Sequence, residues 1–134
     1  GVQLEKGSTA TSFDYRPYTT ELQLCQRYCP MFGPVVADSF AATGYTVSTT
    51  QGRVVFQFPV TARTAPTGIT VTNATGFALA PPFARTASAV AFSESNTQYA
   101  SVDVTTTGLT ANQPTALRIG STGGCKIEFT GCEL

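Results

Sequence analysis

Short segments in which apolar and polar residues alternate dominate the chain. The clearest is residues 53–61, where one face carries Val54, Phe56, Phe58 and Val60 and the other carries Arg53, Val55, Gln57 and Thr61. A period of two residues predicts a half-buried β-strand. Pro59 has no N–H to donate to a ladder, so we expect this strand to end at a sheet edge or a bulge.

Weaker strand patterns recur along the chain, separated by Gly, Pro, Asn and Ser. We expect strands at residues 35–37, 45–49, 68–72, 89–93, 99–105, 115–119 and 126–130, with a hairpin turn at residues 94–98. Residues 77–87 have no clear period and contain Pro81-Pro82, which predicts a loop or an irregular crossing between sheets. The series predicts an all-β fold, an antiparallel β-sandwich of jelly-roll-like type.

One segment, residues 19–28, has the features of a helix. Thr19 or Thr20 can cap its N-terminus. Pro30 cannot continue a helix, so we expect the helix to end near Tyr28. A helix of about two and a half turns is too short to be stable alone, so it must pack against something.

The apolar side chains of this helix point to two sides. Leu22 and Leu24 lie about 200° apart around the helix axis. Leu24 stacks with Tyr28 at i, i+4, whereas Leu22 groups with Cys25 and Cys29. We expect one side to contact the helix's own sandwich and the other to contact another subunit. The alternative is a helix lying flat on one sheet with Leu22 partly exposed.

Composition narrows the set of partners. The 134 residues suit one domain, and eight basic residues balance eight acidic ones. Charged residues are 12% of the chain, about half the usual ~25%, so nucleic acid, which needs clustered Lys and Arg, is not an expected partner. No apolar run approaches the ~20 residues of a membrane span, so we expect no membrane insertion. No cofactor motif is present, and we expect no cofactor.

The first 28 residues carry the most distinctive motif. The run Phe13-Asp14-Tyr15-Arg16-Pro17-Tyr18, followed by Glu21-Leu22-Gln23-Leu24-Cys25-Gln26-Arg27-Tyr28, resembles the start of a β-rich C-terminal domain of bacteriophage tail fibres and related virion appendages. In that family an "LE-G-ATxFEYRPY" linker leads into an "ELxLCQRY" helix. Residues 108–111 and the chain's ending resemble the family's last strands more loosely. Asp14 stands where Glu is usual, and Cys29 stands where a second Tyr is usual.

The resemblance implies a homotrimeric β-sandwich in a virion appendage that is made in the bacterial cytoplasm. Residues 1–18 would be a tether to an upstream fibre module, and residues 19–134 would form the single sandwich domain. Leu22, Leu24, Cys25 and Tyr28 would lie at the trimer contact. The implied role is to hold three chains in register and to present loops that bind the bacterial host surface, through glycan. The alternatives are a purely structural trimerisation or capping domain and a glycan-degrading spike fragment.

The sequence contains four cysteines, which could be free thiols, disulfide-bonded or metal ligands. Along one straight strand Cys125 and Cys132 are more than ~20 Å apart, too far for a disulfide unless the chain turns at Gly131. Cys25 and Cys29 can approach each other at the end of the helix. The spacing does not match common zinc ribbons or fingers, so we expect no metal site. A reducing cytoplasm favours free thiols over a disulfide.

The candidate chemistry favours binding over catalysis. The sequence has no histidine, the usual general base near neutral pH. Glu94 and Asp103 flank the expected hairpin and could form a carboxylate pair, but solvated acids are the simpler interpretation, and no tryptophan is present to stack a sugar. We therefore expect a protein that is not an enzyme.

Neutral-glycan sites combine aromatic faces with amides and hydroxyls, and two sets of residues fit. Tyr99 with Gln98, Ser101 and Asp103 on one outer strand face is the first, and Tyr45 is the centre of the second. The alternative for either tyrosine is a half-buried strand residue or a contact between subunits.

Overall fold

In the part of the chain that the structure describes, one α-helix precedes ten short strands, with a 3-10 helix between the fourth and fifth strands. The computed structural model describes residues 6–9, 12, 15–33, 38–80, 84–120 and 124–132. The elements follow in the order α1 (Tyr18–Tyr28), β1 (Met31–Phe32), β2 (Phe40–Thr46), β3 (Gln51–Gln57), β4 (Gly68–Thr72), the 3-10 helix η1 (Ala74–Gly76), β5 (Phe77–Ala80), β6 (Arg85–Thr86), β7 (Ala89–Ser95), β8 (Tyr99–Thr105), β9 (Pro114–Ile119) and β10 (Lys126–Thr130). The predicted all-β class with one short helix is confirmed.

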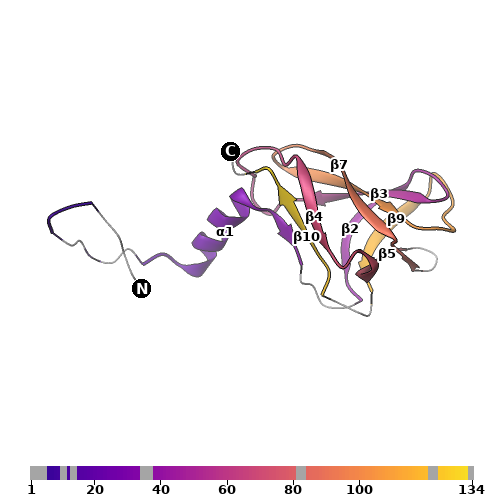
Figure 1. Ribbon diagram of the computed structural model, residues 1–134, viewed down its shortest axis with the longest axis horizontal. Helices are drawn as coiled ribbons and strands as arrows, with labels where there is room; N and C mark the ends of the chain where they lie inside the picture. The colour runs from indigo at the N-terminus through magenta and orange to yellow at the C-terminus, as the bar shows by residue number, and fades with distance from the viewer. Residues whose placement is uncertain are drawn as a thin grey trace.

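The strands form two sheets that face each other as a sandwich (Figure 1). One sheet has three strands in the order β1-β10-β4, and the other has seven in the order β6-β5-β9-β2-β3-β8-β7. Every pairing among the described strands is antiparallel. The chain passes from the smaller sheet to the larger one between β4 and β5, through η1. The predicted antiparallel sandwich is confirmed.

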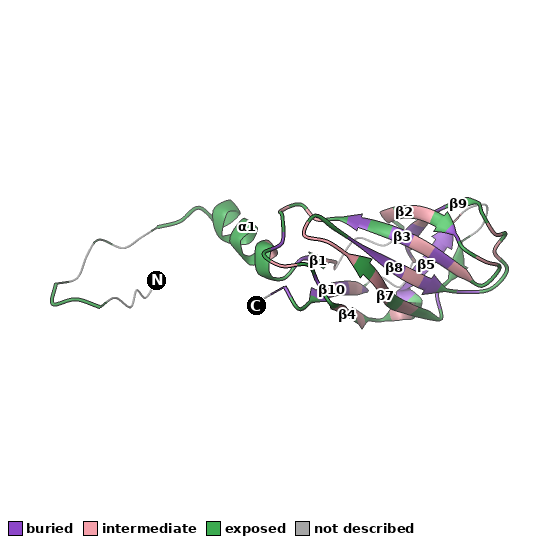
Figure 2. Ribbon diagram, turned by 90° about the horizontal axis from the view of Figure 1, so that it is seen from above, coloured by how far each residue is buried: buried purple, intermediate pink, exposed green. Residues whose placement is uncertain are grey.

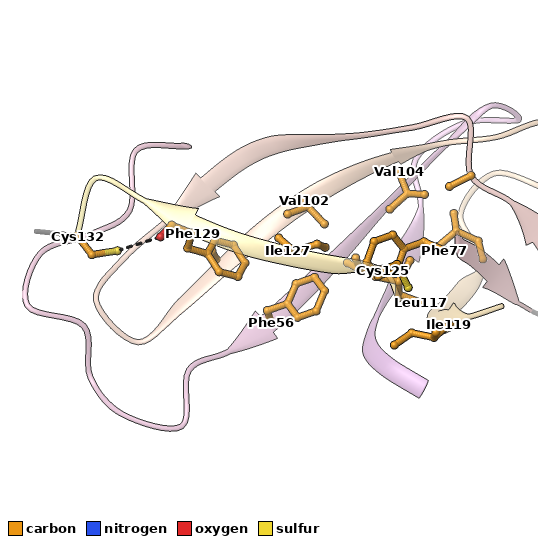
Figure 3. Close-up of a cluster of buried hydrophobic side chains, with 14 residues drawn as sticks. Phe56, Phe77, Val102, Val104, Leu117, Ile119, Cys125, Ile127, Phe129 and Cys132 are labelled. Atoms are coloured by element: carbon orange, nitrogen blue, oxygen red, sulfur yellow. Dashed lines mark hydrogen bonds between the residues drawn. The ribbon is translucent and has the colours of Figure 1, made fainter. Parts of the chain in front are cut away.

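The core lies between the two sheets and follows the alternation of the sequence. Val54 and Phe56 of β3 are buried, whereas Val55 and Gln57 are exposed. From the other sheet, Phe129 of β10 meets Phe56 edge-on, with ring centroids 5.9 Å apart. Figure 3 shows these rings beside the other buried side chains, which include Val102, Val104, Leu117, Ile119 and Ile127. Burial of these apolar faces stabilises the sandwich.

Strand boundaries differ from the sequence prediction in several places. The strand expected at residues 89–93 extends to Ser95, which shortens the hairpin turn expected at residues 94–98, and the strand expected at residues 115–119 begins at Pro114. The strand expected at residues 45–49 begins earlier, at Phe40, and ends at Thr46. The strand expected to reach residue 61 ends at Gln57, two residues before Pro59, because Pro59 cannot donate to the ladder. The loop expected at residues 77–87 instead contains strands β5 and β6, and β5 pairs with β9. Strand 35–37 and the pair Pro81-Pro82 lie outside the described residues.

Helix α1 begins one residue before the predicted start and ends at the predicted residue, Tyr28. The predicted threonine caps are wrong, because Pro17 is the N-cap residue and no side chain caps the helix. Instead, the carbonyl of Pro17 accepts hydrogen bonds from the backbone N–H groups of Thr20 at 3.0 Å and Glu21 at 3.2 Å.

Helix α1 stands away from the sandwich. Figure 2 shows the helix as an exposed element beside the end of the two sheets, and none of its residues is buried. Its attachment is at its C-terminal end, where the Arg27 carbonyl accepts a hydrogen bond from the Arg63 N–H at 2.8 Å and the Arg63 guanidinium lies 5.7 Å from the centre of the Tyr28 ring. The expectation that one side packs on its own sandwich is therefore wrong, and so is the alternative of a helix flat on one sheet.

Candidate binding surface and assembly helix

The outer face of the seven-stranded sheet carries a row of three polar residues. Tyr45 of β2 lies opposite Arg53 of β3, and Arg53 lies opposite Asp103 of β8. Arg53 Nε donates to Asp103 Oδ1 at 2.7 Å, and Arg53 Nη2 donates to Asp103 Oδ2 at 3.0 Å. This paired hydrogen bond, together with the charge of Asp103, raises the pKa of Arg53 further above its ordinary value.

The ion pair changes the interpretation of Asp103. Both of its carboxylate oxygens already accept hydrogen bonds from Arg53, so the residue contributes to the sheet rather than standing as an isolated acceptor. Glu94 lies on the same face. It is opposite Ser101, which is two residues from Asp103 on β8. Asp103 is therefore paired with a guanidinium, and the charge of Glu94 makes a smaller contribution to the raised pKa of Arg53.

Ser101 is the one predicted glycan contact whose expected exposure is wrong. The alternating pattern predicts that it faces solvent with Tyr99 and Asp103, but only 1% of it is exposed. Val55 and Glu94 are its neighbours on the two adjacent strands, and the register of β7 shifts between Phe92 and Glu94. Its hydroxyl has no hydrogen-bond partner among the described residues. A bulge of this kind is not visible in an alternating sequence pattern.

Gln98 and Tyr99 line a pocket at the end of β3 and β8. Its volume is about 320 Å³, and it is lined by Gln57, Phe58, Pro59, Thr61, Gln98 and Tyr99. The sequence predicts that Gln98 and Tyr99 lie together, but it does not predict that the other four residues join them in a pocket. Gln57 could have been included, because the alternating pattern already places it on the outer face of its strand.

Tyr45 and Tyr99 share the outer face but do not form one site. Tyr45 lies opposite Arg53, and Tyr99 lies opposite Gln57, four residues further along the same strand. At ~3.3 Å per residue, that is about 13 Å along the strand direction. Tyr45 is 49% exposed and Tyr99 is 39% exposed.

A second hollow adjoins the first, where β2 and β3 of this sheet meet Phe32 of β1 from the smaller sheet. Its volume is about 460 Å³, and it is lined by Phe32, Phe40, Ala41, Ala42, Thr43, Val55 and Gln57. Gln57 lines both hollows. Sequence reasoning missed this surface because it placed no strand at residues 40–44, and the register shift between Phe40 and Ala42 was not visible in the pattern.

The predicted trimer contacts all lie on the exposed helix. Leu22, Leu24 and Tyr28 have 41%, 39% and 43% of their surface exposed, and Cys25 is also exposed. Because α1 leaves both leucines accessible on opposite sides, the helix presents apolar surface in two directions.

The four cysteines form no disulfide bonds in the structure. The chain turns at Gly131, which has φ +82°, and Cys132 returns into the core. The Sγ of Cys132 donates to the Phe129 carbonyl (Figure 3). Cys125 is fully buried, and burial raises the pKa of its thiol, so the reactive thiolate is disfavoured.

No group of three or more Cys, Asp or Glu residues in the described part of the chain is placed to hold a metal ion. Across the same residues, no helix is long and apolar enough to cross a membrane. Comparison of the chain with protein-family models, with curated proteins and with solved structures found no match.

Proposed function

We propose that this chain is a domain of a bacteriophage tail fibre or similar virion appendage, which assembles as a trimer and binds a bacterial surface glycan. The observation that carries the assembly part is helix α1, which exposes Leu22, Leu24 and Tyr28 and buries none of its residues. The virion-appendage role and the number of three subunits rest on the motif in the first 28 residues, which resembles tail-fibre domains.

Physical chemistry supports the assembly role of α1. An eleven-residue helix is marginal in water without tertiary packing. Covering a leucine side chain fully contributes about 1.5–3 kcal/mol relative to leaving it exposed. Apolar surface on two sides of one helix suits a ring of three, in which each helix has two neighbours related by the same rotation.

The binding role draws on the outer face of the seven-stranded sheet. Its two hollows are lined by aromatic, amide, hydroxyl and small apolar side chains, and no charged residue lines either of them. Glycan recognition uses such surfaces, in which a few polar groups fix orientation above an apolar floor.

The second candidate function is a purely structural trimerisation or capping domain without receptor binding. The exposure of Phe40, 68%, and of Val55, 39%, favours it, because neighbouring subunits could cover this face in the assembly. Binding of the purified trimer to host cells or to a glycan array separates the two functions. A folded trimer that binds neither would leave the structural role.

The experiment that tests the proposal as a whole is the mass of the chain in solution, measured together with its binding to bacterial cells. A trimer that binds cells supports both parts. A stable monomer overturns the assembly part.

A further inference from the structure

The pocket at the end of β3 and β8, lined by six residues from Gln57 to Tyr99, has the composition of a sugar site. Two side-chain amides, one threonine hydroxyl and one tyrosine supply polar groups, and Pro59 and Phe58 supply apolar surface. Within the described part of the chain, the side-chain amides of Gln57 and Gln98 take part in no hydrogen bond, so their donors and acceptors are available to a ligand.

We infer that this pocket binds one ring of a neutral saccharide, with the amides of Gln57 and Gln98 and the hydroxyl of Tyr99 hydrogen-bonded to the sugar hydroxyls and the Tyr99 ring against the sugar face. The inference rests on the proposed glycan-binding role and names the site and the class of ligand. A volume of about 320 Å³ lies at the small end of ligand pockets, which run from ~300 to ~1,000 Å³, so the pocket suits one ring rather than a long chain.

The walls of the pocket are fixed before any ligand arrives. The backbone N–H of Phe58 donates to the Gln98 carbonyl and that of Ala62 donates to the Thr97 carbonyl, both at 2.8 Å. These bonds join the segment after β3 to the turn before β8. In that turn Asn96 Oδ1 accepts from the N–H groups of Gln98, at 2.7 Å, and Tyr99, at 2.9 Å.

The floor of the pocket is held by the core. Phe58 meets Phe129 of the opposite sheet, with ring centroids 5.1 Å apart. A rigid floor and a rigid rim lower the ordering cost of binding, which matters for a ligand that offers only weak contacts.

The absence of charge among the six lining residues indicates a neutral ligand. An acidic sugar is usually held by an arginine or a lysine. Two arginines lie near the lining in the sequence. Arg53 is four residues from Gln57, about 13 Å along the strand, and its guanidinium is paired with Asp103. Arg63 is two residues beyond Thr61, but it does not line the pocket, and its guanidinium lies 5.7 Å from the centre of the Tyr28 ring. A uronic or sialic acid would therefore find no partner for its carboxylate in the pocket.

Titration of the full chain, isotopically labelled, with simple glycosides tests the inference by NMR. The probes are the methyl glycosides of glucose, galactose, mannose and N-acetylglucosamine, with those of glucuronic acid and N-acetylneuraminic acid as the acidic arm. We expect at least one neutral glycoside to shift the side-chain amide signals of Gln57 and Gln98 and the backbone signal of Tyr99. The acidic glycosides should bind more weakly, and added salt should leave neutral binding unchanged.

Three variants define the site. Gln98→Ala and Tyr99→Phe each remove one hydrogen-bonding group and should weaken binding about three- to tenfold. Gln51→Ala is the matched control, because Gln51 lies on the same strand but opposite Thr105, at the far end of β3 from the pocket. It should bind as the unchanged chain does. The amide spectrum of each variant reports whether it is folded.

Two results would overturn the inference. One is the lack of any shift at these residues with every neutral glycoside, and the other is equal or tighter binding of the acidic glycosides. Failure of the broader proposal looks different, because the unaltered chain would then bind no bacterial cells. If the unaltered trimer does bind cells, and trimers that carry Gln98→Ala with Tyr99→Phe bind them equally well, the pocket is not the site of cell binding, yet the appendage role stands.

Discussion

Arg53 and Asp103 face each other across β3 and β8 and are joined by two hydrogen bonds of 2.7 and 3.0 Å. The pair lies on the outer face of the larger sheet, with Tyr45 beside it on β2. It connects two neighbouring strands of that face through side chains as well as through the ladder. Asp103, which the sequence indicates as a candidate glycan contact, therefore also joins two strands of the sheet.

Replacing Asp103 with Asn should destabilise the fold by about 1 kcal/mol. Of the side chains, 30% of Arg53 and 17% of Asp103 are exposed, so solvent partly screens the ion pair. The loss of folding free energy should therefore stay near that of a good surface ion pair. Urea unfolding of Asp103→Asn, Arg53→Gln and the double variant measures it. The double variant should lose less stability than the sum of the two single variants, and strict additivity would show that the pair contributes nothing.

Gly44→Ala should cost about 3 kcal/mol, at the upper end of ordinary overpacking. Gly44 of β2 lies opposite Val54, and a Cβ there would overlap the backbone carbonyl of Arg53 and approach the Val54 Cα to 2.7 Å. Backbone atoms in the middle of a sheet cannot move aside as the end of a side chain can. Gly68→Ala is the control, because its Cβ would meet only the Thr130 hydroxyl, at 3.1 Å. Thermal unfolding of the two variants compares them, and equal losses would contradict the explanation.

Cys125 should make stability fall at alkaline pH. Burial raises the pKa of its thiol above the ordinary value of 9.0, so the unfolded chain releases this proton at a lower pH than the folded chain does. Above pH ~9 the unfolded state therefore binds fewer protons, and the free energy of unfolding decreases until the folded thiol also ionises. Below pH ~8 the contribution is fully present.

Urea unfolding under reducing conditions, compared between about pH 8 and about pH 10, tests this for the unchanged chain and for Cys125→Ala. The variant loses buried volume at every pH, so the difference in pH dependence is the relevant quantity. The unchanged chain should lose more stability over this range than the variant does. Parallel curves would show that the thiol is not shielded.

The regular strands could be predicted because alternation reports burial directly. Val54, Phe56 and Phe129 face the core as their positions in the pattern require. The strands in residues 77–87 could not be predicted, because β5 is buried on consecutive positions from Phe77 to Leu79 and so has no period of two. The pairing of β5 with β9 is a tertiary contact that local sequence does not encode.

The candidate site was predictable only in part. Gln98 and Tyr99 lie together at a strand end as the pattern predicts, but Gln57, Pro59 and Thr61 join them only through the β3–β8 pairing. The burial of Ser101 escapes the pattern because the shifted register of β7 brings Glu94 alongside it. Long-range register, rather than residue type, decides which polar groups are accessible.

Helix α1 should govern assembly. Leu22→Glu together with Leu24→Glu places charge on both exposed sides of the helix and should convert the proposed trimer to monomer, since a buried charge without a partner is costly. The sandwich should remain folded, because α1 contributes no buried residue to it. Gln23→Glu with the leucines intact is the control for charge alone and should leave the assembly unchanged. Size-exclusion chromatography with circular dichroism reports both properties.

The mass of the unaltered chain in solution tests the central claim most directly. Sedimentation equilibrium at micromolar concentration should give three times the 14.1 kDa of one chain. A single species at the mass of one chain, with α1 still helical, would contradict the proposed assembly role of Leu22 and Leu24.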